Sequence, residues 1–330
     1  MSHQTASITP ISAEAFTDQA KQLGFTHVAL LDLAQLDAAW HDTRQAQLQQ
    51  WLDAGYHADM GWMTRNQDKR LDPGALMADT ATVACMTLNY YSDSPPPSCP
   101  DASTAALTMA RYARGDDYHQ VLKEKLRDLL AWCQARDAGF KGRPLTDSAP
   151  MMEKPLAAEL GIGWQGKHSN LITRSHGSWV FIAELLINRR FADVDAPTPH
   201  PDMCGRCRRC IDACPTHALD QPYVLDANRC IAYWTIEYRG EQLPTHIAEH
   251  LNGWVFGCDI CQEVCPWNIR FAQPTTEAAF EARPYNTALH ADELLALDEA
   301  TFSQRYDNSP VERTGLANLK RNARAATGQD

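Results

Sequence analysis

The sequence predicts a mixed domain of the α+β or α/β class, followed by a metal-binding module and a helical C-terminal segment. Helical and strand patterns alternate as far as about residue 190, which favours an α/β arrangement. Eight of the eleven cysteines lie between residues 204 and 265, and the pattern after residue 270 is mostly helical. The expected divisions are therefore an α/β domain, a cysteine-rich module and a helical tail, at 1–190, 191–270 and 271–330.

The N-terminal half begins with an amphipathic helix and a strand. In SAEAFTDQAKQLGF (12–25), apolar residues recur at helical spacing after Ser12, a residue type that caps helices, and we expect Gly24 to end the helix. THVALLD (26–32) is a short apolar run and predicts a buried strand. A long helical pattern then continues to Gly55.

Two further strands and one long helix complete the first domain. TATVACMTLNYY (80–91) is a strand candidate, and the loop SPPPSCP (94–100) follows it. GSWVFIAELLIN (177–188) predicts another buried strand. In DYHQVLKEKLRDLLAWCQARDAG (117–139), apolar side chains at helical spacing form one face, made of Val121, Leu122, Leu126, Leu129, Leu130 and Cys133.

The composition is that of a globular protein, with 44% hydrophobic and 22% charged residues among 330. The formal net charge of −11 argues against binding nucleic acid over the whole surface but allows a local basic patch. The N-terminal sequence lacks the pattern of a secretory signal, and Glu184 interrupts the longest apolar run, WVFIAELLI. We therefore expect a cytoplasmic protein with no membrane segment, whose cysteines bind metal rather than form disulfides.

The cysteine spacing predicts two [4Fe–4S] clusters. MCGRCRRCIDACP (203–215) matches the bacterial ferredoxin run C-x2-C-x2-C-x3-C-P, whose fourth cysteine ligates the other cluster in two-cluster proteins. GCDICQEVCPWN (257–268) supplies three more cysteines, and Val255 stands where a fourth would open the run. The remaining cysteine of the module is Cys230. The expected crossed sets are Cys204, Cys207, Cys210 and Cys265 for one cluster, and Cys214, Cys230, Cys258 and Cys261 for the other.

Zinc is the alternative ligand, because C-x2-C pairs also suit tetrahedral zinc sites. Three cysteines at successive x2 spacing, two C-P endings and the lack of ligand-spaced histidine pairs favour clusters instead. The other thiols, Cys85, Cys99 and Cys133, lie in or beside apolar or Pro-rich segments and are expected to be buried or incidental.

Two cofactor motifs are imperfect in this sequence. GIGWQG (161–166) fits the dinucleotide-binding pattern G-x-G-x-x-G, but it follows a helical pattern where that fingerprint requires a strand. DYHQVL (117–122) has the Asp and His of a histidine-ligating cobalamin motif, but Leu122 stands where that motif needs glycine. A corrinoid bound here would therefore lack that histidine ligand.

Five segments in family order give a specific resemblance to epoxyqueuosine reductases, the cobalamin- and iron–sulfur-dependent enzymes that complete queuosine in tRNA. They lie within about residues 50–270 and are YARGDDYH (112–119), DSAPMMEKPLAAELGIGWQGKHSNLIT (147–173), CGRCRRCIDACPTHAL (204–219), RCIAYWTIEYRG (229–240) and GCDICQEVCPWN (257–268). The resemblance implies a nitroreductase-like cobalamin-binding domain, a two-[4Fe–4S] ferredoxin-like module and a short remnant of a HEAT-like helical C-terminus.

The resemblance also implies the reaction and its components. The epoxide of epoxyqueuosine would be reduced by two electrons, giving the alkene and water. One cobalamin without a protein histidine ligand would be the reactive centre, fed by the two clusters from an external low-potential electron donor. The expected partner is tRNA carrying epoxyqueuosine in its anticodon loop, and the chain is expected to be a monomer.

The resemblance assigns the proton donor to Asp147 in TDSAP. A general acid at neutral pH needs a raised pKa, and we expect burial against the corrin ring to raise that of Asp147. A helix N-cap or turn is the simpler interpretation of D-S-A-P from the residues alone.

Further positions are expected to contact the cofactor or the RNA. The positions expected at cobalamin are Arg70, Arg111, Gly166, Lys167, Ser169, Thr173, Cys258 and Asp259. The positions expected at tRNA are Glu237, Arg239, Lys320 and Arg321, with Arg189, Arg190, Arg206, Arg208 and Arg209 as further phosphate donors.

Two other functions remain open at this point. A reductive dehalogenase-like corrinoid protein would share the clusters and cobalamin but act on a small molecule. A ferredoxin-type protein would only relay electrons and would bind no corrinoid, so the absorbance of anaerobically purified protein separates the two.

Overall fold

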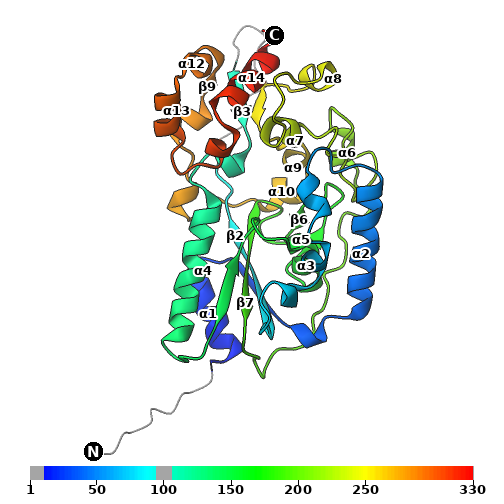
Figure 1. The fold of residues 1–330 in the computed structure, drawn as a ribbon, viewed down its shortest axis with the longest axis vertical. Helices are drawn as coiled ribbons and strands as arrows, with labels where there is room; N and C mark the ends of the chain where they lie inside the picture. The colour runs from blue at the N-terminus through cyan, green and yellow to red at the C-terminus, as the bar shows by residue number, and fades with distance from the viewer. Residues whose placement is uncertain (1–10, 94–105, 330) are drawn as a thin grey trace, which may run out of the picture.

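The computed structural model describes residues 11–93 and 106–329. Its main sheet has the order β1-β2-β7-β4, and each neighbouring pair is antiparallel (Figure 1). The strands are β1 (His27–Asp32), β2 (Thr82–Asn89), β4 (Gly142–Leu145) and β7 (Val180–Ile187). The three predicted strands are confirmed as β1, β2 and β7, but the antiparallel order makes the domain α+β rather than a parallel α/β domain.

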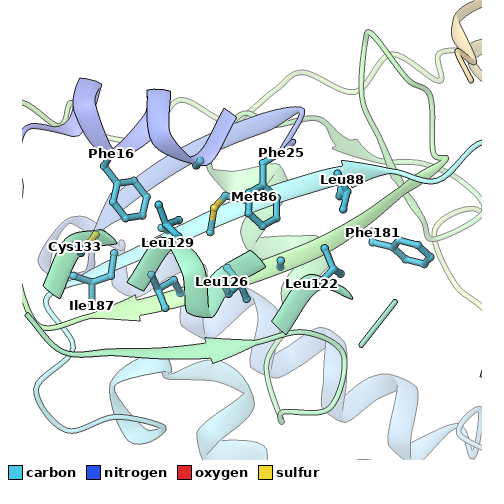
Figure 2. Packing of buried hydrophobic residues seen from close by; sticks show 14 of the residues in the cluster. Phe16, Phe25, Met86, Leu88, Leu122, Leu126, Leu129, Cys133, Phe181 and Ile187 are labelled. Carbon is cyan, nitrogen blue, oxygen red and sulfur yellow. The ribbon is translucent and has the colours of Figure 1, made fainter. Parts of the chain in front are cut away.

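One face of this sheet is covered by α1 (Ala13–Gln22) and α4 (Tyr118–Gln134), which lie side by side in Figure 1. Ser12 caps α1 as predicted, because its hydroxyl accepts the N–H of Ala15 at 3.1 Å. The expected apolar face of α4 is confirmed: Figure 2 shows Leu122, Leu126, Leu129 and Cys133 packed toward the sheet, and none of the four is exposed.

The other face carries α2 (Ala38–Asp53), α3 (Gln67–Leu71), α5 (Glu153–Glu159) and the hairpin of β5 (Trp164–Gln165) and β6 (Leu171–Ile172). The long helical pattern to Gly55 is confirmed in part, because the 3₁₀ turn Leu33–Gln35 and Leu36–Asp37 separate β1 from α2. Apolar side chains of α5, including Leu156 and Ala157, pack on the sheet. The loop SPPPSCP with Cys99 lies outside the described residues.

The helices of the cysteine-rich module are short and are joined by loops and by one strand, Trp254–Phe256. They are α6 (Arg209–Asp212), α7 (Ile231–Ile236), α8 (Thr245–Ala248), α9 (Ile260–Glu263) and α10 (Pro266–Phe271). Pro266 occupies the first turn of α10, where its missing N–H costs no hydrogen bond. The C-P ending of the second cysteine run therefore starts a helix directly after Cys265.

A second sheet joins all three expected divisions of the chain. Its order is β8-β3-β9, with β3 parallel to β8 and antiparallel to β9, and the strands are β3 (Ala106–Met109), β8 (Trp254–Phe256) and β9 (Leu289–His290). The C-terminal division contains the helices α11 (Pro284–Thr287), α12 (Ala291–Ala296), α13 (Glu299–Tyr306) and α14 (Leu316–Thr327). The remaining 3₁₀ turns in the described residues are Gly61–Thr64, Pro73–Ala75, Arg111–Ala113, Ala278–Phe280 and Pro310–Thr314. One core unites Leu107, Phe256 and Leu319, so the C-terminal helices pack on strands from both preceding divisions.

None of the helices in the described ranges combines the length and the apolar character needed to cross a bilayer.

Candidate functional site

The eight module cysteines line two cavities. The first cysteine cavity, of about 200 Å³, is lined by Cys204, Cys207, Cys210 and Cys265. The central cavity, of about 330 Å³, is lined by Cys214, Cys230, Cys258 and Cys261. Each cavity thus brings together the four residues of one expected crossed set, with thiols from both sequence runs.

Burial raises the pKa of several of these thiols, which therefore hold their protons tightly in the absence of metal. Burial, and then the neighbouring Cys265 and Cys204, raise the pKa of Cys210 to about 11. Burial and the neighbouring Cys230 raise the pKa of Cys261 well above its usual value. Because metal binds the thiolate form, cluster assembly must displace these protons and would relieve the repulsion between the sulfurs. The two four-thiol sets therefore fit a cationic iron–sulfur core.

The wall of the central cavity is built where strands β3 and β8 end. Gly257 follows β8 with φ +69°, and a Cβ there would lie 2.6 Å from Cβ of Ala110, so the close approach of the two strand ends requires glycine. Asp259 is 2% exposed, and its Oδ2 accepts the backbone N–H of Arg111 at 2.7 Å. Burial raises the pKa of Asp259 to about 6 despite this hydrogen bond.

His168 lies between the two cavities and lines both. Its ring is 3% exposed, and Nδ1 accepts the N–H of Asn170 at 3.2 Å, which assigns the proton to Nε2. Burial lowers the pKa of His168 to about 4, so the ring is neutral. Nε2 is a buried donor without a hydrogen-bond partner among the described residues. Such a donor indicates a bound acceptor, which supports a resident cofactor at this position.

Of the eight positions expected at cobalamin, Ser169, Cys258 and Asp259 line the central cavity. Ser169 also lines a side cavity of about 610 Å³, which adjoins the central cavity there. Arg111 fixes the position of Asp259 in the cavity wall, because its backbone N–H donates to Asp259. Its guanidinium donates to Glu263 at 2.9 Å.

Arg70 and Thr173 lie away from this lining. Arg70 is 9% exposed, donates to the carbonyl of Trp62 at 3.3 Å and stacks on its ring with the guanidinium carbon 5.5 Å from the centroid. Thr173 is buried and donates its hydroxyl to the carbonyl of Gly177 at 3.1 Å. Both side chains therefore hold local structure in place.

Gly166 and Lys167 belong to the β5–β6 hairpin and the first cysteine cavity rather than to the central cavity. A Cβ at Gly166 would lie 2.5 Å from Cδ1 of Ile172, so glycine is needed for packing within the hairpin. Lys167 lines the first cysteine cavity, and its Nζ donates to the carbonyls of Gly205 and Cys207 at 2.6 and 2.9 Å. Lys167 thus secures the loop that carries the first cysteines.

Asp147 lines a third cavity of about 510 Å³, which adjoins the central cavity at Tyr112 and Tyr118. The Tyr118 hydroxyl donates to Oδ2 of Asp147, and Nε2 of His119 lies 3.3 Å from the same oxygen. The backbone of Asp147 has φ +51°, an uncommon left-handed conformation that occurs at functional turns. The side chain is 54% exposed, so it is accessible from this cavity.

The expected raised pKa of Asp147 is corrected by these contacts. Partial desolvation of this half-exposed carboxylate alone would raise its pKa, but the hydrogen bonds from His119 and Tyr118 hold the pKa of Asp147 at about 2. Burial alone would lower the pKa of His119, but its contacts with Asp117 and Asp147 raise it to about 9. At neutral pH the proton of this group therefore resides on His119, between two ionised carboxylates.

A buried carboxyl pair lies beneath the Asp147 turn. Oε1 of Glu153 accepts the backbone N–H of Asp147 at 2.5 Å. Burial, and then the charge of Asp147, raise the pKa of Glu153 to about 8. Glu184, on the central strand β7, is 0% exposed, and burial with the neighbouring Glu153 raises its pKa well above the usual range. The pair therefore retains at least one proton at neutral pH, because two adjacent buried carboxylates cannot both be charged.

The positions expected at tRNA separate into two groups. Glu237 lines the third cavity and accepts both hydrogen bonds of Arg313, at 2.6 and 2.7 Å. Arg239 is exposed and donates to the carbonyl of Ile236, and Lys320 is half-buried on α14. These side chains are accessible to a ligand at the surface.

Arg321 is corrected to a structural residue. It is 5% exposed and donates to the carbonyls of Trp234, Tyr238 and Gly240 at 3.1, 3.2 and 2.6 Å. Its guanidinium also stacks on Tyr238, 5.3 Å from the ring centroid. With its donors occupied in the interior, Arg321 is not accessible to RNA phosphates.

Sequence reasoning missed Tyr118, His119 and Lys154 as site residues, and it placed His168 only within the loop 166–169 expected near the corrin. Lys154 lines the central cavity and donates to Oδ1 of Asn170 at 2.9 Å. All four stand inside the segments that carry the family resemblance, which is the signal that could have found them. Their side chains meet only after folding, so no local spacing marks them.

Residues 203–268 match the family described as a 4Fe-4S double cluster binding domain, and together with the two four-thiol cavities this match defines an iron–sulfur redox enzyme. Residues 70–148 match the family described as epoxyqueuosine reductase QueG, DUF1730. The epoxyqueuosine reductase of a Synechocystis species is 41% identical over 89% of this chain and 99% of the relative. The chain belongs to the epoxyqueuosine reductase family.

Further relatives agree with this membership. The epoxyqueuosine reductase of a Synechococcus species is 39% identical over 98% of this chain and 97% of the relative. A crystal structure of epoxyqueuosine reductase with an epoxyqueuosine-modified tRNA-Tyr stem loop matches with a TM-score of 0.84 and 26% identity, over 95% of this chain and 80% of that chain. The Bacillus subtilis enzyme, in a structure with its catalytic aspartate loop swung out of the active site, matches with a TM-score of 0.83, 26% identity and the same coverage.

Proposed function

We propose that this chain reduces epoxyqueuosine in the anticodon loop of tRNA to queuosine. The observation that carries the proposal is the junction of the central and third cavities, which share Tyr112 and Tyr118: four cysteines line the central cavity, and Asp147 lines the third. An electron source and a proton source thus meet at one site. The reduction consumes two electrons and two protons, breaks both carbon–oxygen bonds of the epoxide, and releases water with the alkene.

The electron path would use the crossed cysteine sets as ligands of two [4Fe–4S] clusters. The outer cluster would occupy the first cysteine cavity, and the inner cluster would occupy part of the central cavity. A single cobalamin, when bound, supplies a strongly reducing centre for the carbon–oxygen bond. Ser169 and Asp259 would hold it in the central cavity, which adjoins the side cavity at Ser169.

The proton path would use the three residues around Asp147. His119 holds a proton at neutral pH and faces Asp147, which faces the third cavity. Asp147 would pass this proton to the departing oxygen, and His119 would restore it. Tyr118 and Glu153 orient the Asp147 carboxylate and backbone, respectively, so that the donor stays at the cavity junction.

The finer expectations belong to the same proposal. The chain would be a cytoplasmic monomer, with a nitroreductase-like cobalamin domain and a short HEAT-like remnant at its C-terminal end. Cobalamin would have no protein histidine ligand, in keeping with the proton that His168 carries on Nε2. The tRNA would approach the third cavity, whose rim carries Glu237 and Arg313.

The test is an anaerobic assay with epoxyqueuosine-containing tRNA, cobalamin and dithionite, read by nucleoside mass spectrometry. We expect queuosine to form, and Asp147→Asn to slow turnover by about 100-fold or more while iron and corrinoid contents stay unchanged. Full activity in Asp147→Asn contradicts the proton-donor assignment. Purified protein that binds iron but no corrinoid favours an electron-relay function, and reduction of a halogenated small molecule but not of the tRNA favours a dehalogenase-like one.

A further inference from the structure

The first cysteine cavity lies directly beneath the protein surface. Met203 lines this cavity and is 36% exposed. Gly205, between the first two cysteines, faces open space, since a Cβ there would meet nothing within 4 Å. The neighbouring Arg206 is exposed. A cluster held in this cavity would therefore be separated from solvent by little more than one loop.

Helix α10 forms the other part of this surface, beside the loop that carries Met203 and Arg206. Ile269 donates its backbone N–H to the carbonyl of Cys265 at 3.0 Å, so the two residues lie one helical turn apart on the same side of the helix. Cys265 faces the first cysteine cavity, and Ile269 is 65% exposed. This is the largest exposed fraction of any large apolar side chain among the described residues.

The resulting surface, here called the cluster face, consists of Met203, Arg206, Arg209, Ile269 and Arg270. Its three arginines are exposed, and none of them forms an ion pair with another described residue. The acidic groups beside it are already engaged. Asp212 pairs with Arg208 at 3.6 Å, and Asp202 accepts the N–H of Cys204 at 2.7 Å and the hydroxyl of Tyr223.

The charge of the cluster face is opposite to that of the whole chain. Exposed arginines on a protein of net charge −11 mark a surface that attracts an acidic partner. Met and Arg around an exposed apolar centre are the side chains enriched at protein–protein interfaces. A phosphate backbone would use the arginines but not Met203 and Ile269, so the composition favours an acidic protein over RNA.

We propose that the cluster face docks a small, acidic, one-electron carrier protein of the ferredoxin type. The proposal rests on the proposed function, because it assigns the outer cluster as the entry point for electrons. In each encounter the carrier is oxidised by one electron and the outer cluster is reduced by one, so two encounters supply one epoxide reduction. His119 and Asp147, which hold and relay the proton, line the third cavity and take no part in docking.

Charge reversal on the cluster face tests this docking. The protein with both clusters is titrated with an oxidised, acidic [2Fe–2S] ferredoxin at low ionic strength, and reduction of its clusters by the reduced ferredoxin is followed by stopped-flow absorbance. We expect the Arg206→Glu/Arg209→Glu double variant to weaken binding and slow reduction by about tenfold or more, and added salt to reduce the difference. Arg127→Glu, an exposed change on α4, is the matched control and should behave like the wild type.

Two further measurements separate docking from the reaction itself. Dithionite needs no docking surface, so dithionite-driven turnover of the Ile269→Glu variant should match that of the wild type. Ile269 lies outside the cysteine loop, and Ile269→Glu should also weaken ferredoxin binding. This variant therefore still tests the docking surface if the double variant loses iron. Failure of dithionite-driven turnover in the wild type would count against the proposed function, whereas loss of ferredoxin binding alone would not.

Two outcomes overturn the docking proposal. One is ferredoxin binding that is absent in the wild type or unchanged in both the double variant and Ile269→Glu. The other is a loss of affinity for a tRNA stem loop in the double variant with ferredoxin binding intact, which would make the cluster face an RNA-binding surface.

Discussion

His119 is held between two carboxylates, and this arrangement determines where the proton of the site resides. Nδ1 lies 2.7 Å from Oδ1 of Asp117, and Nε2 lies 3.3 Å from Oδ2 of Asp147. Asp117 also caps α4 by accepting the backbone N–H of His119, so the ring and the start of the helix are fixed together. A protonated imidazole donates from both nitrogens and satisfies both carboxylates at once.

His119→Gln tests this location of the proton. Glutamine retains polar contacts but carries no titratable proton, so we expect turnover in the dithionite assay to fall by about 100-fold. Because the pKa of His119 is raised to about 9, wild-type turnover should decline as pH rises through 9, and this decline should be missing in the variant. The exposed His246→Gln is the matched control. An unchanged alkaline decline in His119→Gln would show that another group supplies the proton.

The Glu153–Glu184 pair makes folding stability depend on pH. Both pKa values are raised above the ordinary 4.5, so above pH 4.5 the folded state binds more protons than the unfolded state. The pair therefore contributes fully to the free energy of unfolding below pH 4.5. This contribution is lost progressively as the pH rises, and for Glu153 the loss continues up to its folded-state pKa of about 8.

Glu184→Gln isolates this effect. A glutamine at this position cannot ionise, so we expect the free energy of unfolding to decline less between pH 6 and 8 in the variant than in the wild type, and the difference to widen with pH. Urea unfolding at several pH values measures it, with the exposed Glu124→Gln on α4 as the control. Parallel curves for Glu184→Gln and the wild type would mean that the pair does not hold an extra proton.

At the scale of elements, α14 connects the C-terminal helices to the cysteine-rich module. Asn322 donates to the carbonyls of Thr235 and Val255 at 2.9 and 2.8 Å, and Arg321 donates to the carbonyls that follow α7. These bonds satisfy backbone acceptors at the end of α7 and in β8, where short elements leave carbonyls without partners of their own. The helix thus stabilises the segment leading to Cys258.

Arg321→Met separates a structural from an RNA-binding role. The variant keeps most of the side-chain volume but leaves buried carbonyls without donors, so we expect a loss of about 2–4 kcal/mol in the free energy of unfolding. Arg324→Met, on the exposed side of the same helix, should change it by less than about 0.5 kcal/mol. Weaker tRNA binding with unchanged urea unfolding in Arg321→Met would restore Arg321 as a phosphate contact.

At the scale of the whole molecule, helices and strands with long periodic sequence patterns could be predicted, but the contacts between segments distant in the sequence could not. The strands β1, β2 and β7 and the helices α1 and α4 carry strong local patterns, and each of the two cysteine sets predicted from the ferredoxin spacing lines one cavity. Strand order has no local signal, so the antiparallel sheet was missed, and β3 is too short to recognise. The lowered pKa of Asp147 arises in part from Tyr118, 29 residues away, and such a contact exists only after folding.

Each cysteine cavity draws thiols from both runs, and this has a consequence for biogenesis. During translation, the segment through Cys214 leaves the ribosome well before Cys258, Cys261 and Cys265, when both cavities still lack part of their thiols. β8, which precedes these last thiols, must also find β3 about 145 residues earlier in the chain. With the proposed ligand sets, iron loading would have to wait for a nearly finished chain, and premature termination before residue 258 would leave neither cluster with its full set of thiols.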